Sequence, residues 1–181
     1  MGCSKYLIQG IVNNCLASVG GVVEVYLAKR DEIASVAVNS AYTTSDDHVV
    51  SMITGITLEA SATGFVKYWV RKNSSSMTST LNVGDNSSYY STELSLTFSR
   101  MDASKRMEML AMAFEDLVAI VKDANGKYYY LGYDNPITAS AQTGETGQQR
   151  SDANQYTVTL MDESTELPHF ILDSVVEGLV D

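Results

Sequence analysis

The sequence predicts a mainly β protein of the α+β class, and residues 94–133 carry the pattern that predicts it. Leu94, Leu96 and Phe98 alternate with polar residues, which is the period of a half-buried strand. A run of good helix formers follows, and an Asn-Gly turn then joins two apolar segments. We therefore expect one helix packed on a sheet, with more sheet in the rest of the chain.

The helix is expected over residues 102–115. Asp102 stands at the N-cap, where its carboxylate can accept a bond from a free first-turn N–H. The apolar face that we expect to be buried comprises Ala103, Met107, Leu110, Ala111 and Phe114.

A hairpin is expected directly after the helix, and the helix is expected to lie on it. Residues 117–121 are an unbroken apolar run, which is typical of a strand covered on both faces. Asn125-Gly126 predicts the turn. Tyr128 and Tyr130 then alternate with Tyr129 and Leu131, and Gly132 indicates a bulge or a close backbone approach.

The first part of the chain predicts four strands, over residues 22–28, 33–38, 49–58 and 65–72. Val23, Val25 and Leu27 are expected on one face of the first strand. Residues 29–32 form a charged turn, residues 39–48 a polar loop, and Gly55 marks a bulge or turn.

Residues 73–79 predict an exposed edge or a mobile loop, and residues 80–83 and 89–99 predict the strands of a long polar hairpin that projects from the body. Its turn falls at residues 84–87, and its tip has too few apolar residues to belong to a core. Such a hairpin can lend a strand to a partner, and an ordinary surface loop is the alternative.

The last part of the chain predicts a weak strand at 137–143, a loop at 144–154 and a strand at 155–161 in which Tyr156, Val158 and Leu160 share a face. Residues 170–180 predict a last strand or a tail docked on another subunit. We expect a single domain, 1–181, with an N-terminal arm (1–19) and a C-terminal tail (about 165–181).

Composition excludes several classes of function. The formal net charge of −10 argues against binding DNA through its phosphates. No apolar run is long enough to cross a bilayer, and no secretory signal is expected. Cys3 and Cys15 do not make a disulfide framework, and we expect structural or surface roles for His48 and His169.

No catalytic, metal or cofactor motif is found, so we expect a protein that is not an enzyme and binds no cofactor. Nucleophile-elbow, P-loop and dinucleotide patterns are absent from the sequence. Adjacent acids such as Asp162-Glu163 are expected on a solvated surface. The 11 tyrosines fit subunit contacts or a sugar-binding platform.

The order of several segments resembles small virion proteins of phages that infect Bacteroidetes, including crAss-like phages. The segments are GGVVEVYLAKRDEIASV, FVKYWVRKNSSSMTSTLNV, YYSTELSLTFSRMDASKR, EDLVAIVKDANGKYYYLGYDN and YTVTL. The resemblance covers residues 20–160 and implies a tail-tube or tail-ring subunit with a β-sandwich or barrel-like fold, one flanking helix and a long hairpin that engages the next copy.

That resemblance implies a structural protein of the virion tail, made in the cytoplasm of the bacterial host. Its partners would be copies of itself in a ring, neighbouring tail or connector proteins, and DNA that passes through the lumen without specific binding; no membrane contact is expected. The inter-subunit candidates are Asn73, Ser75, Met77, Tyr89, Tyr90, Phe170 and Leu172.

Two alternatives stay open beside the tail subunit. A head–tail connector or neck protein would use the same kind of ring. A carbohydrate- or receptor-binding β-module would instead require an exposed aromatic row that includes Trp69, Tyr128 and Tyr130.

Overall fold

The computed structural model describes residues 11, 17–44, 49–71 and 73–180, and it is mainly β with one main helix. Most of the expected N-terminal arm, both cysteines and His48 lie outside these residues. The elements are β1 (Val22–Lys29), η1 (Arg30–Glu32), β2 (Ile33–Thr43), β3 (Val49–Leu58), β4 (Val66–Tyr68), β5 (Ser76–Val83), β6 (Ser88–Ser99), α1 (Ala103–Phe114), β7 (Leu117–Asp123), β8 (Tyr128–Leu131), β9 (Thr138–Glu145), β10 (Gln155–Ser164), β11 (His169–Ile171) and α2 (Asp173–Glu177).

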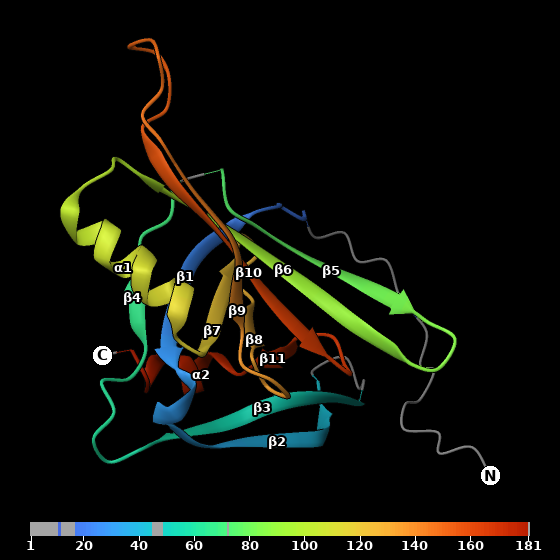
Figure 1. Cartoon of the computed structure of the whole chain (residues 1–181). Helices are drawn as coiled ribbons and strands as arrows, with labels where there is room; N and C mark the ends of the chain where they lie inside the picture. Colours follow the sequence, from blue (N-terminus) through green and yellow to red (C-terminus); the bar gives the residue numbers. More distant parts are fainter. Residues whose placement is uncertain (1–10, 12–16, 45–48, 72, 181) are drawn as a thin grey trace.

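The strands form two sheets, which Figure 1 shows packed against each other. The larger, sheet A, has the order β2-β3-β11-β8-β7-β1-β4, and the smaller, sheet B, has the order β5-β6-β10-β9. All neighbouring strands are antiparallel except β11 and β3. The expected mainly β fold is therefore confirmed.

Sheet A must curl, because a short connection joins two strands that are distant in its order. β1 and β2 are five strand spacings apart, which is about 24 Å in a flat sheet. Only η1 separates them, and the four steps from Lys29 to Ile33 reach at most about 14 Å. The curl brings the β2 and β4 ends of the sheet toward each other, as in a partly open barrel.

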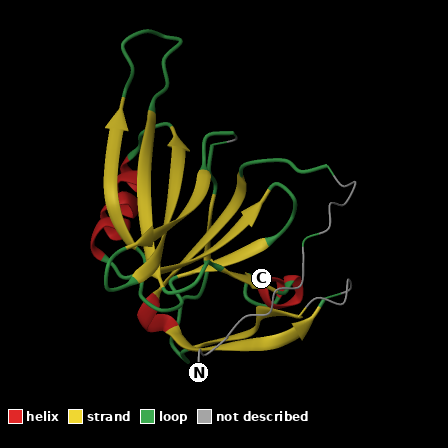
Figure 2. Ribbon diagram, turned by 90° about the vertical axis from the view of Figure 1, so that its right-hand side faces the viewer, coloured by secondary structure: helices red, strands yellow, loops and turns green. Residues whose placement is uncertain are grey.

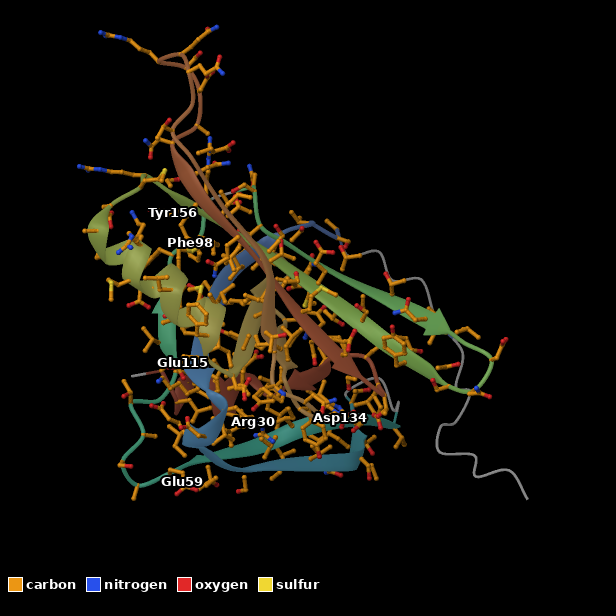
Figure 3. All side chains as sticks on the ribbon, in the orientation of Figure 1. Arg30, Glu59, Phe98, Glu115, Asp134 and Tyr156 are labelled. Atoms are coloured by element: carbon orange, nitrogen blue, oxygen red, sulfur yellow. The ribbon has the colours of Figure 1, made fainter. Side chains whose placement is uncertain are left out.

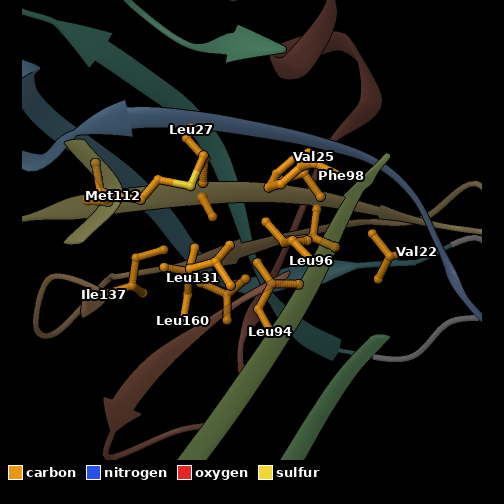
Figure 4. Packing of buried hydrophobic residues seen from close by; sticks show 14 of the residues in the cluster. Val22, Val25, Leu27, Leu94, Leu96, Phe98, Met112, Leu131, Ile137 and Leu160 are labelled. Carbon is orange, nitrogen blue, oxygen red and sulfur yellow. The ribbon is translucent and has the colours of Figure 1, made fainter. Parts of the chain in front are cut away.

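Each face of sheet A buries its own apolar core. The concave face encloses a cluster with Ile53, Val118, Ile120, Tyr130 and Ile171 at its centre. The opposite face packs on sheet B through a second cluster, part of which is shown in Figure 4: Val25, Leu27, Leu94, Leu96, Phe98, Leu131 and Leu160. The unbroken apolar run of β7 follows from this, because its alternate residues enter the two cores.

α1 closes one side of the sandwich, but with a different face from the one expected. Asp102 caps the helix as predicted, since its side chain accepts a hydrogen bond from the backbone N–H of Lys105. The buried residues are Met109 and Met112, while Phe114 is 85% exposed. The expected face of Ala103, Met107, Leu110, Ala111 and Phe114 points outward, so that prediction is wrong.

The hairpin of β7 and β8 forms as predicted. Asn125-Gly126 makes the turn, and Met109 and Met112 of α1 share a core with Leu117 and Leu131 of the hairpin. α1 itself lies along β9, where the Gln142 side-chain amide donates to the carbonyl oxygen of Met109 over 2.8 Å. Gly132 comes directly after β8 with φ +89°, in the close approach that the sequence indicates.

Other strands differ from expectation at their ends. β2 continues to Thr43 through part of the expected polar loop, and β4 is only three residues long. Val23 is exposed because the register of β1 shifts between Val22 and Glu24. A register shift also falls beside Gly55 of β3, in line with the predicted bulge.

The C-terminal segment is part of the body rather than a separate tail. β11 lies inside sheet A between β3 and β8, and Ile171 and Val176 are buried in the concave core. Turned by 90°, Figure 2 shows α2 beside the sheet and the loop after β9 extending away from both sheets. Among the described residues, no helix combines the length and the apolar character needed to cross a membrane.

Candidate functional site: the open sheet edge at β5

The four edge strands of the two sheets are the places where another chain can add a strand. They are β2 and β4 in sheet A, and β5 and β9 in sheet B. Unpaired backbone N–H and C=O groups at such edges are templates for pairing, and proteins commonly block them with charges, proline, bulges or a covering element. The four edges differ in how far they are blocked.

β9 and β4 are edges with a neighbouring element or a short length. α1 lies along β9 and is tied to it by the hydrogen bond from Gln142, although most residues of β9 are exposed. β4 has only three residues, and the Tyr68 hydroxyl donates to the Glu108 carboxylate of α1 over 2.6 Å. β4 is therefore too short to pair with a long strand, and α1 restricts the approach to β9.

β2 is long but irregular. Its 11 residues contain no charge and no proline, which leaves the edge chemically open. However, its register against β3 shifts at three places. Because bulges twist a strand away from flat pairing, β2 is a weaker template than its length suggests.

β5 is the most open edge within the described part of the chain. It pairs with β6 through eight successive residues without a register shift, and no described strand pairs with its outer side. Its sequence, SMTSTLNV, contains no charge and no proline, and Leu81 and Val83 are exposed. Among the described residues, none of the usual protections of an edge strand is found at β5.

The whole β5–β6 hairpin is poor in charge. Residues 73–99 contain only two ionisable side chains that are charged at neutral pH, Asp85 and Glu93. In a protein with a net charge of −10, this leaves one long strip where two copies can approach with little repulsion. Figure 1 shows the hairpin in green, reaching beyond the rest of sheet B.

A polar contact supports β5 from behind. The Ser79 and Thr92 hydroxyls are 2.8 Å apart, and Thr92 is buried. Met77, two residues earlier, packs against the core between the sheets. The inner side of the strand is thus fixed by its own sheet, while Thr78 and Thr80 on the other side remain exposed.

Five of the seven inter-subunit candidates belong to this hairpin or lead into it. Met77 and Tyr90 are half-buried, Tyr89 is exposed, and Asn73 is exposed with φ +58°. Ser75 is different, because it is buried and its hydroxyl accepts a hydrogen bond from the backbone N–H of Thr97. Its position makes it an internal link between β5 and β6.

Phe170 and Leu172, the other two candidates, lie on β11 and directly after it, and neither is at a sheet edge. Phe170 is on β11, and its ring centroid is 4.6 Å from that of Tyr129. The backbone N–H of Leu172 donates to the carbonyl oxygen of Ile53. The structure therefore does not bring these two residues together with the hairpin.

The aromatic row expected of a carbohydrate-binding module does not form from the three residues named for it. Tyr130 is 1% exposed in the concave core, whereas Trp69 is 80% exposed beyond β4. Burial raises the pKa of Tyr130 to about 12. A ring enclosed in this way cannot stack on a sugar.

Asp162 is the one carboxyl group among the described residues whose pKa is shown to be raised, and it is structural. It was expected on the surface but is 3% exposed, because β10 continues the inward alternation of Val158 and Leu160. Burial raises its pKa to about 6, although a hydrogen bond from the N–H of Gly132 partly opposes the shift. Within the described part of the chain, no His, Cys, Asp and Glu residues gather as metal ligands would.

Comparison of the chain with protein-family models, with curated proteins and with solved structures gave no match. The sequence feature that indicates the β5 edge is the absence of charge and proline over residues 76–83. Residues 33–43 share this feature, but the polar residues from Asn39 onward predict a loop and not the second half of β2.

Proposed function

We propose that this protein is a structural subunit of a bacteriophage tail, which assembles into rings that form or extend the conduit for DNA. The observation that carries the proposal is the open, charge-free edge of β5. The resemblance in the order of segments from residue 20 to residue 160 supplies the biological setting.

Ring closure requires that one surface of a copy meets a different surface of the next copy. β5 provides the first surface, and β2 is the other long edge without charge or proline. Pairing β5 of one copy with β2 of the next extends sheet B of one into sheet A of its neighbour. Main-chain hydrogen bonds then supply much of the contact, as in other cases of strand addition.

The overall charge fits a conduit. A wall with a net charge of −10 per subunit repels the phosphates of DNA at long range, so the nucleic acid can slide without being held. A neck or connector ring would use the same edge and the same charge. The number of stacked rings separates the two roles.

The test is electron microscopy and sedimentation of the concentrated protein, with two variants that differ only in position. Thr80→Lys places a charge on the open edge, and Thr143→Lys places the same charge on β9, the edge strand that α1 lies along. Both positions are exposed, so both monomers should fold. We expect rings from the wild type and from Thr143→Lys, and monomers from Thr80→Lys.

Two results would contradict the proposal. One is a wild-type protein that stays monomeric at the highest attainable concentration. The other is a ring that forms equally well from the Thr80→Lys variant, since β5 would then not be in the contact. Stacked rings would indicate a tube subunit, and rings that remain single would indicate a connector.

A further inference from the structure

Positive charge gathers at one end of this acidic molecule. Arg100 follows β6, and its backbone N–H donates to the carbonyl oxygen of Asn154 at the base of the loop 146–154, which contains Arg150. Arg71 donates to the side chain of Gln155 over 2.7 Å. We call this region the basic end; it holds Arg71, Arg100, Lys105, Arg106 and Arg150, against the acids Asp102, Glu145 and Asp152.

Negative charge gathers in several loops between strands, and hydrogen bonds link these loops to one another. The N–H of Arg30 donates to the carbonyl oxygen of Asp116, and the N–H of Glu59 to that of Glu32. Arg30 and Asp134 line one hollow of about 410 Å³. This acidic end holds Asp31, Glu32, Glu59, Glu115, Asp116 and Asp134, against Lys29 and Arg30.

The two ends lie on opposite sides of the molecule, and α1 connects them. The helix begins beside Lys105, whose ammonium group donates to the carbonyl oxygens of Ser99 and Arg100. It ends at Glu115, whose carboxylate pairs with Lys29 at 2.9 Å. Twelve residues of helix separate the ends by about 18 Å. Figure 3 shows Glu59, Arg30 and Asp134 in the lower part of the molecule, Glu115 above them, and Phe98 and Tyr156 in the upper part, toward the basic end.

The dipole of α1 explains only part of this arrangement. A helix prefers acids near its N-terminus and bases near its C-terminus, because its dipole is positive at the start and negative at the end. Asp102 at the N-cap follows this preference and pairs with Lys105 at 2.9 Å, whereas Arg106 in the first turn and Glu115 at the end oppose it. The charges of Arg106 and Glu115 therefore add to the helix dipole, and they have the same direction as the separation of charge between the two ends.

We propose that the basic end of one copy docks on the acidic end of another, so that rings stack with one polarity. This inference builds on the proposed function, and it concerns a surface separate from the β5 edge. The partner is a second copy because the chain itself carries the complementary surface at its opposite end. DNA is a poorer partner, since three acids lie among the five cations of the basic end and the rest of the protein is acidic.

Charge reversal at each end tests the proposal. Arg106→Glu with Arg150→Glu changes the net charge of the basic end from +2 to −2. Asp31→Lys, Glu59→Lys and Asp116→Lys together change that of the acidic end from −4 to +2. All five side chains are exposed, and Arg106→Glu adds an acid to the first turn of α1, which favours the helix. The control is Lys127→Glu, which reverses an exposed charge in the turn between β7 and β8, a position that belongs to neither end and not to the β5–β6 hairpin.

We expect each of these two variants to lose end-to-end association at least about tenfold at low ionic strength, because like charges then face each other. The variant that combines all five substitutions has its two ends exchanged in sign and should associate again. Lys127→Glu should behave as the wild type. Sedimentation and electron microscopy measure the association at about 20 mM and about 500 mM salt, where the screening lengths differ several-fold.

The outcomes separate this inference from the proposed function. Rings that never stack, or stack equally well in the two charge-reversal variants, overturn the inference and leave the ring proposal intact. End-to-end association of monomers that is lost in each of these variants and restored in the combined variant, without rings, supports the inference and contradicts the ring proposal. Binding of a short DNA duplex that only the Arg106→Glu, Arg150→Glu variant loses, without stacking of the wild type, also overturns the inference.

Discussion

Asp162 shows how a regular pattern can bury a charge. Residues 158, 160 and 162 of β10 point to the same side, and the first two are apolar. The carboxylate of Asp162 accepts one hydrogen bond, from the N–H of Gly132, while its second oxygen has no partner. The pKa is therefore raised to about 6, and the ionised form is disfavoured in the folded state.

The stability of the protein should depend on pH through this group. Between about pH 4 and pH 6 the folded state binds a proton at Asp162 that the unfolded state has lost, so the free energy of unfolding falls as the pH rises. Asp162→Asn keeps an acceptor for Gly132 and removes the charge. We expect it to stabilise the protein by about 1 to 3 kcal/mol at pH 7 and to have little effect below pH 4.

Urea denaturation of both proteins at several pH values checks this, with Asp134→Asn as a control of opposite sign. Hydrogen bonds from the backbone N–H and hydroxyl of Thr165 and from the hydroxyl of Ser164 lower the pKa of Asp134. Its contribution is present at neutral pH and is lost as the solution is acidified through its lowered pKa. A constant difference between Asp162→Asn and the wild type from pH 3 to pH 7 would contradict the assignment.

Both the backbone conformation and the close neighbours of Gly132 exclude a side chain at this position. Its φ is +89°, and an added Cβ would lie 3.0 Å from Cγ1 of Val118 and 3.2 Å from the carbonyl oxygen of Leu117. Gly126 also has a positive φ, but open space surrounds it. We expect Gly132→Ala to cost about 2 to 4 kcal/mol and Gly126→Ala about 1 kcal/mol, because only the first adds overpacking to the backbone penalty.

Thermal or urea unfolding of the two glycine variants measures this difference. Equal losses of stability would show that backbone conformation alone matters at both positions. At the residue scale the sequence indicates Gly132 because a glycine inside a strand pattern is unusual. It does not indicate Asp162, because an acid next to Glu163 looks like an ordinary surface pair.

At the scale of elements, α1 illustrates what periodicity alone leaves undecided. Methionines and other apolar residues occur on both sides of the helix, so the sequence contains two apolar stripes. The stripe with Met109 and Met112 is buried, because it faces the gap between the two sheets. The stripe with Met107 and Phe114 has more apolar area and was the natural prediction, yet it faces outward.

This assignment predicts a difference between two substitutions in the same helix. Met112→Ala removes a buried side chain from the core between the sheets and should cost about 2 to 4 kcal/mol. Phe114→Ala should change the free energy of unfolding by less than about 0.5 kcal/mol, because its ring is exposed. Urea denaturation measures both, and a larger effect from Phe114→Ala would mean that the helix packs by its other face.

Strands with local signals could be predicted, and strands fixed by distant partners could not. β3, β6, β7, β8 and β10 have clear alternation, buried runs or turn residues, and they lie close to the expected positions. β11 has only three residues, and it is a strand because it pairs with β3 on one side and with β8 on the other. The curl of sheet A depends on which strands are neighbours, and local sequence patterns do not predict such long-range pairings.

At the scale of the whole molecule, two proposed contacts differ in their electrostatics. The edge contact joins strips without charge on two bodies that each carry −10, so repulsion between the bodies opposes it. The end-to-end contact joins surfaces of opposite charge, so attraction drives it. Salt screens both effects, with a screening length of about 30 Å at 0.01 M and about 3 Å at 1 M.

The two contacts should therefore respond to salt in opposite directions. Raising the ionic strength from about 20 mM to about 500 mM should increase the fraction of protein in rings and decrease the number of rings per stack. Sedimentation velocity gives the first quantity, and electron microscopy of the same samples gives the second. If both quantities rise with salt, the end-to-end contact is not electrostatic; if both fall, attraction between charges and not strand pairing holds the ring together.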